Sequence, residues 1–202
     1  MRTTKSVVAG TLHMVGATTR TGRMVTMSPR LPAHRTSPVG PGVGTVETKY
    51  ATVATPDDPL HLIAGGRLDH VTVAYETYGT LNEARDNAVY ICHALTGDAH
   101  AAGFHPGADR PGWWDNIIGP GRAIDTDRFF VIASNLLGGC SGTTGPASTN
   151  PDTGKRWGLD FPQIDMHDFV EVHLRLAEHL GVEHFHAVVG GSMGGMQAST
   201  GR

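Results

Sequence analysis

The chain has 202 residues, of which 39% are apolar and 17% charged, and its formal net charge is −3. This length and apolar content suit one domain of ordinary size, or a piece of a larger one, and they exclude wholesale disorder. No run approaches the roughly 18 apolar residues that a membrane-spanning helix needs. The two cysteines, Cys92 and Cys140, cannot form a disulfide framework, which favours a reducing, cytoplasmic compartment. The Cys and His spacings match no common zinc motif, so we predict neither a metal site nor a cofactor.

Charge is unevenly distributed along the chain. Six of the 16 basic residues precede the first acidic residue, Glu47, so the remainder holds all 19 acidic residues against ten basic ones. An acidic body argues against nucleic acid as a partner, because phosphate contacts need clustered Lys and Arg. We interpret residues 1–45 as a disordered or leader-like basic arm, with an organelle-targeting or secretory segment as the alternatives, and residues 46–202 as the body.

Three segments of the body have the pattern of strands. Residues 70–77 alternate between apolar and polar side chains, which predicts a half-buried strand. Residues 87–93 and 129–135 are continuous apolar runs of strand length. Such runs are typical of strands that are buried on both faces of a parallel sheet.

A helix followed by another strand is predicted next. Residues 165–180 carry one apolar stripe at helical spacing, formed by Met166, Phe169, Val170, Leu174, Ala177 and Leu180. Asp165 is a suitable N-cap, and Gly181 is a suitable C-terminal stop. Residues 184–189 then form a short apolar run. The order strand, helix, strand predicts a crossover in an α/β sheet.

The strongest chemical signal follows this last strand directly. Residues 190–194 read Gly-Gly-Ser-Met-Gly and match G-x-S-x-G, the nucleophile elbow. A serine nucleophile on such a turn adopts a strained backbone conformation, and neighbouring backbone leaves room only for glycine at Gly190 and Gly194. The helix that follows would place the N–H of Met193 to stabilise an oxyanion beside Ser192. The alternative is a glycine-rich turn with an incidental serine.

The loop after the strand at 87–93 has a place in the same chemistry. In folds with a nucleophile elbow, this loop supplies the second oxyanion N–H, and we predict that Leu95 provides it. His93 and His100 flank the loop and could act as bases or metal ligands, but histidines at loop edges are more often structural. The triad histidine of this fold also follows the serine in chain order.

Five motifs together resemble one enzyme family, and the match covers about residues 45–198. They are residues 73–82, 91–100, 111–116, 138–146 and 190–197. This set is similar to homoserine O-acetyltransferase. The resemblance implies an α/β-hydrolase fold with a mostly parallel sheet, and transfer of an acetyl group from acetyl-CoA to L-homoserine in methionine biosynthesis.

The resemblance also implies roles for single residues. Ser192 matches the nucleophile, and Leu95 and Met193 match the oxyanion-hole donors. Trp113, Trp114 and the loop at 138–146 match motifs near the active site. Family members are typically cytoplasmic homodimers. Homoserine O-succinyltransferase, serine O-acyltransferase, an esterase of the same fold and a non-enzymatic fragment remain alternative functions.

The segment after the elbow departs from the family pattern. Only ten residues follow Ser192, and none is Asp, Glu or His, although the triad acid and histidine follow the serine in this fold. We therefore expect a fold truncated after the elbow and little activity from these 202 residues alone. An exposed sheet edge would also make them poorly soluble. Residues 199–202 read as a departure from the expected helix.

Overall fold

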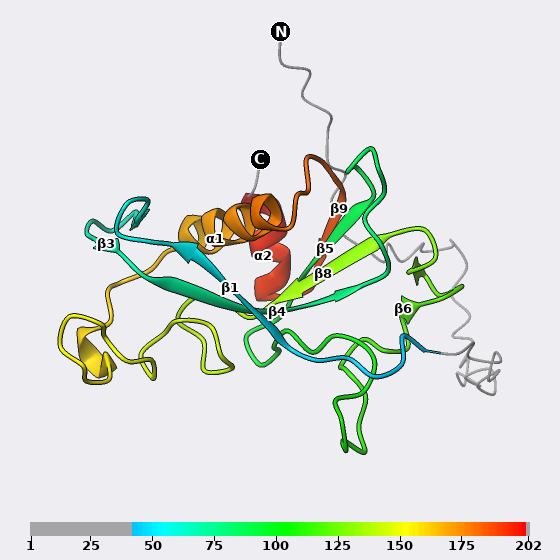
Figure 1. Cartoon of the computed structure of the whole chain (residues 1–202), viewed down its shortest axis with the longest axis horizontal. Coiled ribbons are helices and arrows are strands. Elements are labelled where there is room, and N and C mark those ends of the chain that lie inside the picture. The colour runs from blue at the N-terminus through cyan, green and yellow to red at the C-terminus, as the bar shows by residue number, and fades with distance from the viewer. Residues whose placement is uncertain (1–41, 201–202) are drawn as a thin grey trace, which may run out of the picture.

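A five-stranded sheet lies at the centre of the molecule in the computed structural model, which describes residues 42–200 (Figure 1). β5 pairs in parallel with β8 and β9, whereas β4 is antiparallel to both of its neighbours. Four strands therefore share one direction and only β4 runs against them, which confirms the predicted α/β class with a mostly parallel sheet. In spatial order the strands are β1 (Lys49–Ala54), β4 (Val71–Tyr78), β8 (Phe130–Ser134), β5 (Ala88–Cys92) and β9 (Phe185–Gly190).

Short elements decorate the loops around this sheet. Within residues 42–200 they are two small strand pairs and one turn of 3₁₀ helix. They were not predicted from the sequence, because a strand of two residues is too short to show a periodic pattern. They are β2 (Leu60–His61) with β3 (Arg67–Leu68), β6 (Ile118–Gly119) with β7 (Ile124–Asp125), and η1 (Gly158–Asp160).

The four strands predicted from the sequence are confirmed to within about a residue at each end. β5 is buried along its whole length, as its continuous apolar run predicts. β4 differs from its prediction, because six of its eight residues are buried instead of one alternating face. It lies between β1 and β8 with both of its faces covered, and the polar Glu76 and the Tyr78 hydroxyl have hydrogen-bond partners inside.

Two helices cover one face of the sheet: α1 (Met166–His179) and α2 (Met193–Thr200) (Figure 1). Asp165 caps α1 as predicted, since its carboxylate accepts a hydrogen bond from the backbone N–H of His167 at 3.0 Å. In return, the N–H of Asp165 donates to the carboxylate of Asp168 at 2.7 Å, which completes a capping box. Gly181 ends the helix with a φ of +76°, a conformation that favours glycine.

The buried side of α1 differs from the predicted apolar stripe. Leu174 was expected in the stripe but is 49% exposed, whereas Asp168 and His173 are buried. The carboxylate of Asp168 has hydrogen-bond partners inside, which makes its burial acceptable, and His173 packs against an aromatic ring. Asp168 accepts a hydrogen bond from the N–H of Ile63 at 3.0 Å, and the ring of His173 lies 4.7 Å from that of Tyr90. Of the predicted stripe, Ala177 is buried and Phe169 and Leu180 pack against the core, so the prediction is wrong at Leu174 and missed the buried polar residues, whose contacts hydrophobic periodicity cannot reveal.

The end of α2 also corrects the sequence prediction. A departure from helix was expected from residue 199, but the helix continues through Thr200. The hydroxyls of Ser199 and Thr200 both donate to the carbonyl of Met196, each at 2.9 Å. Both hydroxyls therefore have hydrogen-bond partners within the helix.

Apolar clusters lie on both faces of the sheet. The cluster under the helices includes Leu60, Leu68, Val71, Val73, Tyr90, Ile132, Val172 and Leu176. The cluster on the opposite face includes Tyr78, Val89, Ile91, Ala101, Ala102, Ile118 and Val131. The segment between β5 and β8 supplies that second cover, so the central strands are shielded from water on both sides.

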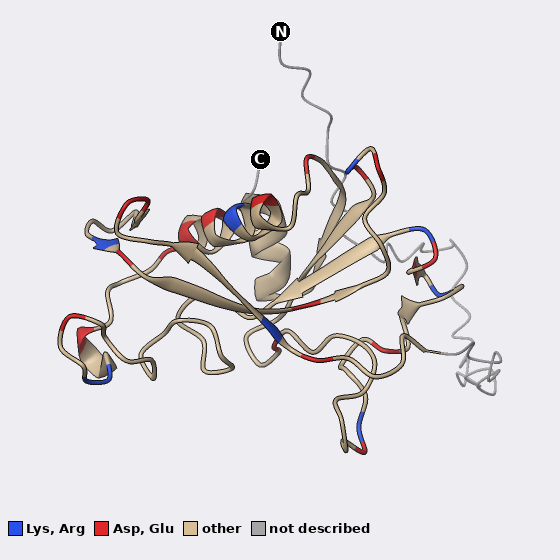
Figure 2. Cartoon of the chain, viewed as in Figure 1, with Lys and Arg blue, Asp and Glu red and all other residues tan. Residues whose placement is uncertain are grey.

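Residues 1–41 of the predicted basic arm lie outside the described residues, so the arm and its boundary stay predictions. Close to that boundary, the N–H of Val46 donates to the carbonyl of Phe104 at 2.9 Å. No helix within residues 42–200 has the length and apolar character needed to cross a membrane. Over the same residues, Lys and Arg are scattered in separate short segments rather than gathered on one face (Figure 2).

Candidate active site

The corner between β9 and α2 holds Ser192 in an unusual conformation. β9 ends at Gly190 and α2 begins at Met193, so only two residues make the turn. Ser192 has a φ of +58°, in the left-handed region, and its side chain is exposed. Such a conformation costs a non-glycine residue about 1–3 kcal/mol and persists only where the surrounding structure enforces it. The corner is therefore strained at the residue that the motif singles out.

Close backbone packing explains the glycines of the motif. A β-carbon at Gly190 would lie 2.5 Å from the carbonyl carbon and oxygen of Gly194, which real side chains do not tolerate. A β-carbon at Gly194 would collide with the carbonyl oxygen of Cys92 at the end of β5. The N–H of Gly195 donates to the carbonyl of Ser192 at 2.9 Å, which begins the helix immediately after the serine. This is the cramped strand-to-helix turn that G-x-S-x-G predicts.

The loop after β5 lies at the same end of the sheet as Ser192. β5 and β9 are parallel neighbours, and Cys92 is paired with Gly190, so both strands end together. Leu95 follows β5 by three residues, and its side chain is 76% exposed. A turn closes behind it, since the N–H of Gly97 donates to the carbonyl of Ala94 at 2.9 Å. Leu95 and Met193 thus occupy neighbouring strand ends, while their oxyanion role remains a proposal.

A pocket of about 630 Å³ opens beside the serine. Its walls come from the end of β5, the loop that follows, the tryptophan pair and the β9–α2 corner. Trp113 is fixed there by a hydrogen bond from its indole N–H to the carbonyl of Asp98 at 3.1 Å. The lining residues are Cys92, Ala94, Thr96, Gly97, Asp98, His100, Pro111, Trp113, Trp114, Gly191 and Ser192.

The structure brings some of the expected motifs to this pocket and not others. Trp113 and Trp114 both line it, and their ring centroids are 4.9 Å apart. The loop at 138–146 instead packs over β4, where the hydroxyl of Thr143 accepts from the N–H of Ala74 at 3.0 Å. Sequence reasoning did not single out Asp98 or Thr96 as pocket residues. Both belong to the segment at 91–100, one of the five motifs that resemble the family, and this was the signal that could have found them.

Of the side chains at the ends of β5 and β9, the Ser192 hydroxyl is better suited as a nucleophile than the Cys92 thiol. Burial raises the pKa of the Cys92 thiol to about 12, so the thiolate is scarce at neutral pH. Burial also lowers the pKa of His93, whose Nδ1 lies 2.6 Å from the carbonyl oxygen of Ala94. His93 is therefore neutral near pH 7 and holds the start of the loop.

The side chain of Gln197 connects the β9–α2 corner with the loop that follows β5. Its side chain is buried, and its amide donates to the carbonyls of His93 at 3.3 Å and Met193 at 3.2 Å. One side chain thereby connects the first turn of α2 with the end of β5. The two strand ends that flank Ser192 are held together by this bridge and by the contact between Gly194 and Cys92.

Comparison with known proteins identifies the fold family. A family model described as alpha/beta hydrolase fold matches residues 87–200, which is more than half of the chain. Among solved structures, esterase E22 is 45% identical with a TM-score of 0.70, over 76% of this chain and 42% of that one. Homoserine O-acetyltransferase from Bacillus anthracis is 36% identical with a TM-score of 0.71, over 77% of this chain and 42% of that one.

Curated relatives are similar over the same region. A homoserine O-succinyltransferase from a Nocardioides species is 68% identical over 155 residues, which are 77% of this chain and 42% of the relative. A homoserine O-acetyltransferase from Methanobrevibacter ruminantium is 60% identical over 156 residues, 77% of this chain and 31% of the relative. The chain thus spans less than half the length of these relatives. It belongs to the alpha/beta hydrolase fold family, and its relatives include proteins named homoserine O-acyltransferases, as the five motifs indicated.

Proposed function

We propose that this chain is part of an acyltransferase that transfers an acetyl group from acetyl-CoA to the hydroxyl of L-homoserine through an acetyl-Ser192 intermediate. One observation carries the proposal: Ser192 is exposed on a left-handed corner and lines a pocket. The names of the curated relatives support homoserine as the acceptor. The strain at the corner supports catalysis, since a serine without a task could be replaced there by glycine.

In the first step, the hydroxyl oxygen of Ser192 attacks the thioester carbonyl of the acyl-CoA. The new C–O bond forms as the serine proton passes to a base, and the C–S bond then breaks to release the CoA thiolate, which takes up a proton. The backbone N–H groups of Leu95 and Met193 would stabilise the tetrahedral oxyanion between these events. The position of both residues at the ends of neighbouring parallel strands supports this role.

In the second step, the homoserine hydroxyl attacks the acetyl ester of Ser192. The homoserine hydroxyl proton passes to the base, the bond between the acetyl carbon and the serine oxygen breaks, the serine oxygen takes a proton from the base, and O-acetylhomoserine departs. The triad acid and histidine of this fold follow the serine in chain order, and the ten residues after Ser192 contain neither Asp, Glu nor His. We therefore assign both roles to sequence outside residues 1–202, and we expect little turnover from these residues alone.

The proposal also specifies the acyl donor, which is acetyl-CoA rather than succinyl-CoA. Several relatives named O-acetyltransferase share 52–60% identity with this chain, but a relative named O-succinyltransferase shares 68%. We propose acetyl-CoA as the donor, with succinyl-CoA as the alternative. We also propose, on the family resemblance, that the whole protein is a cytoplasmic homodimer, which gel filtration with light scattering would test.

A second candidate function is ester hydrolysis. Esterase E22 is 45% identical to this chain, a higher identity than the 36% shared with the Bacillus anthracis acetyltransferase. The same acyl-enzyme serves both reactions, and they differ only in whether water or an alcohol takes the acyl group. The first step therefore does not distinguish the two functions.

The experiment compares CoA release by the whole protein with and without L-homoserine, using acetyl-CoA and succinyl-CoA in turn. Release that depends on homoserine and is faster with acetyl-CoA supports the proposal. Equal release without any alcohol would indicate hydrolysis, and faster release with succinyl-CoA would change the donor. Ser192→Ala should abolish release, whereas Ser199→Ala, which changes an exposed serine of the helix that follows, should retain it.

A further inference from the structure

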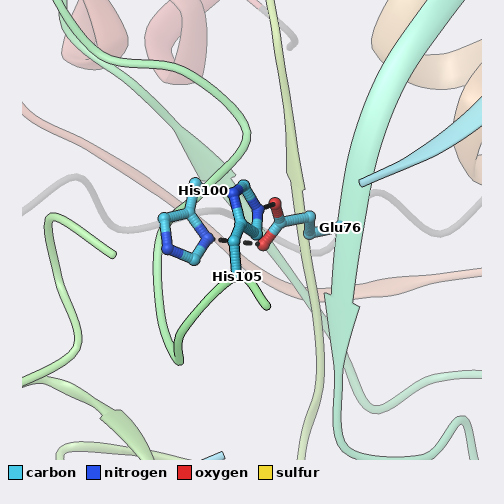
Figure 3. Close-up of side chains that lie close together, drawn as sticks. All are labelled: Glu76, His100 and His105. Atoms are coloured by element: carbon cyan, nitrogen blue, oxygen red, sulfur yellow. Dashed lines mark hydrogen bonds and ion pairs between the residues drawn. The ribbon is translucent and has the colours of Figure 1, made fainter. Parts of the chain in front are cut away.

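Glu76, His100 and His105 form a compact cluster on the face of the sheet opposite the helices (Figure 3). Glu76 lies on β4, and both histidines lie in the segment after β5. Nδ1 of His100 is 3.0 Å from Oε2 of Glu76, and Nε2 of His105 is 2.7 Å from Oε1. The two imidazole rings stack with their centroids 3.8 Å apart. Both rings thus direct a nitrogen at the same carboxylate.

The carboxylate at the centre of this cluster is deeply buried. The Glu76 side chain is 1% exposed, and the basic side chains that contact it within residues 42–200 are the two histidines. Burial of a carboxylate is costly unless a positive charge and hydrogen bonds compensate it. A bound cation would supply positive charge at the point where both rings converge.

The donor atoms lie close enough together to share one metal ion. The ligand atoms of the three side chains lie within 4.8 Å of one another. The hydroxyl oxygen of Thr48 adds a fourth donor, 3.0 Å from Oε1 of Glu76 and 3.4 Å from Nε2 of His105. Two imidazole nitrogens with a carboxylate favour Zn²⁺ and related transition metals over Mg²⁺ or Ca²⁺, which prefer oxygen ligands. We propose that Glu76, His100 and His105 bind one divalent cation of the zinc class, with Thr48 beside the fourth position.

Surrounding groups hold the carboxylate in place for this role. The hydroxyl of Tyr78 donates to Oε2 of Glu76 at 2.8 Å. That hydroxyl accepts in turn from the backbone N–H groups of Ala101 and Ala102, at 3.0 and 3.1 Å. Outer hydrogen bonds of this kind orient metal ligands and tune their affinity. The side chain of His105 is 38% exposed, which gives a cation a path from solvent.

No zinc motif is visible along the sequence, because the three ligands meet only in the folded chain. Glu76 and His100 are 24 residues apart, and they lie on different elements. The cation would fasten β4 to the segment after β5, which also lines the Ser192 pocket through His100. Its role here is structural, and it takes no part in the acyl-transfer steps. The inference therefore stands independently of the proposed function.

The test measures zinc binding to the whole chain, purified without a histidine tag, treated with a chelator and dialysed. Competition with a chromophoric chelator should show about one equivalent of tightly bound Zn²⁺. Co²⁺ in place of Zn²⁺ should give visible absorption bands of a low-coordinate nitrogen and oxygen site. Zn²⁺ should also raise the melting temperature, because the cation binds the folded state.

His105→Gln is the decisive variant, because glutamine can still donate a hydrogen bond to Glu76 but does not replace an imidazole ligand. Its zinc affinity should fall by at least about 100-fold, beyond the loss that outer-shell changes cause, and its melting temperature should no longer respond to Zn²⁺. His61→Gln, on an exposed histidine of β2, and His13→Gln with His34→Gln should bind as the unaltered chain does. No zinc binding by the folded unaltered chain, or equal binding by His105→Gln, would overturn the proposal and leave a hydrogen-bonded His–Glu–His cluster.

Discussion

The α-carbon of Gly194 lies so close to the carbonyl oxygen of Cys92 that a β-carbon at position 194 would collide with it. This contact joins the first turn of α2 to the end of β5. It is one reason why the corner at Ser192 is tight, because the helix must begin against the neighbouring strand. The geometry of the candidate nucleophile is therefore set by a residue that has no side chain.

Gly194→Ala should destabilise the chain strongly. The new methyl group meets backbone that belongs to the central sheet and cannot move aside, so the loss should exceed about 3 kcal/mol or prevent folding. Gly195→Ala is the matched control, since a β-carbon there is 3.4 Å from the nearest atom outside its helix, the carbonyl oxygen of Gly190. In the helix, that change should be neutral or stabilise by up to about 1 kcal/mol. Urea unfolding of both variants measures the difference, and equal stabilities would show that the corner is looser than described.

Ser192→Gly should make the protein more stable while abolishing acyl transfer. Glycine adopts a φ of +58° without strain, so the free energy of unfolding should rise by about 1 kcal/mol. Ser199→Gly, at a position inside α2, should instead lower the free energy of unfolding by about 0.5 kcal/mol. Thermal melting of the two variants measures these changes in stability. A loss of stability in Ser192→Gly would mean that the serine is there for packing rather than for catalysis.

Asp168→Ala should cost more stability than its position on a helix suggests. The buried carboxylate accepts from the N–H groups of Asp165 and Ile63, and alanine leaves both donors without that partner. We expect a loss of about 2–4 kcal/mol in the free energy of unfolding. Asp165→Asn is the control, because asparagine caps a helix as well as aspartate does. Similar losses in both variants would show that Asp168 acts only as a local cap.

His173 should make stability depend on pH in weakly acidic solution. Burial, and then the nearby His93, lower the pKa of His173 from 6.5 to about 3. The unfolded chain therefore binds a proton below pH 6.5 that the folded chain does not bind until about pH 3. The contribution of the neutral imidazole to the free energy of unfolding is fully present above pH 6.5. It is lost as the pH falls toward 3, at up to about 1.4 kcal/mol per pH unit.

His173→Phe tests this dependence, since it keeps an aromatic ring next to Tyr90 but removes the titrating group. Between pH 6.5 and 5, the variant's free energy of unfolding should fall less steeply than that of the unaltered protein. His179→Phe changes an exposed histidine at the end of the same helix and should leave the slope unchanged. Identical slopes in all three proteins would show that His173 is protonated in the folded state.

Local patterns in the sequence predicted the parts of the fold that depend on neighbouring residues. Asp165 and Gly181 marked the ends of α1 because capping and left-handed turns are decided within a few residues. The continuous apolar run at 87–93 predicted a strand buried on both faces. The corner at Ser192 was also predictable, because the spacing of its glycines reflects a local packing constraint.

Contacts between distant segments could not be predicted in this way. Asp168 and His173 are buried where they contact Ile63 and Tyr90, which lie on other segments of the chain. The periodicity of residues within α1 carries no information about those contacts. Glu76 likewise meets His100 and His105 only after β4 and the segment behind β5 are brought together. Polar residues on a buried face are tolerated where partners exist, so a hydrophobic pattern alone assigns them to the surface.

The most direct measurement asks whether Ser192 carries the acyl group. The whole protein is mixed with acetyl-CoA in the absence of homoserine, quenched in acid and digested, and the peptide that contains Ser192 is examined by mass spectrometry. We predict one added acetyl group on Ser192, lost when homoserine is supplied before quenching. An unmodified Ser192 in a protein that still turns over acetyl-CoA, or an acetyl group on another residue, would contradict the central role of this serine.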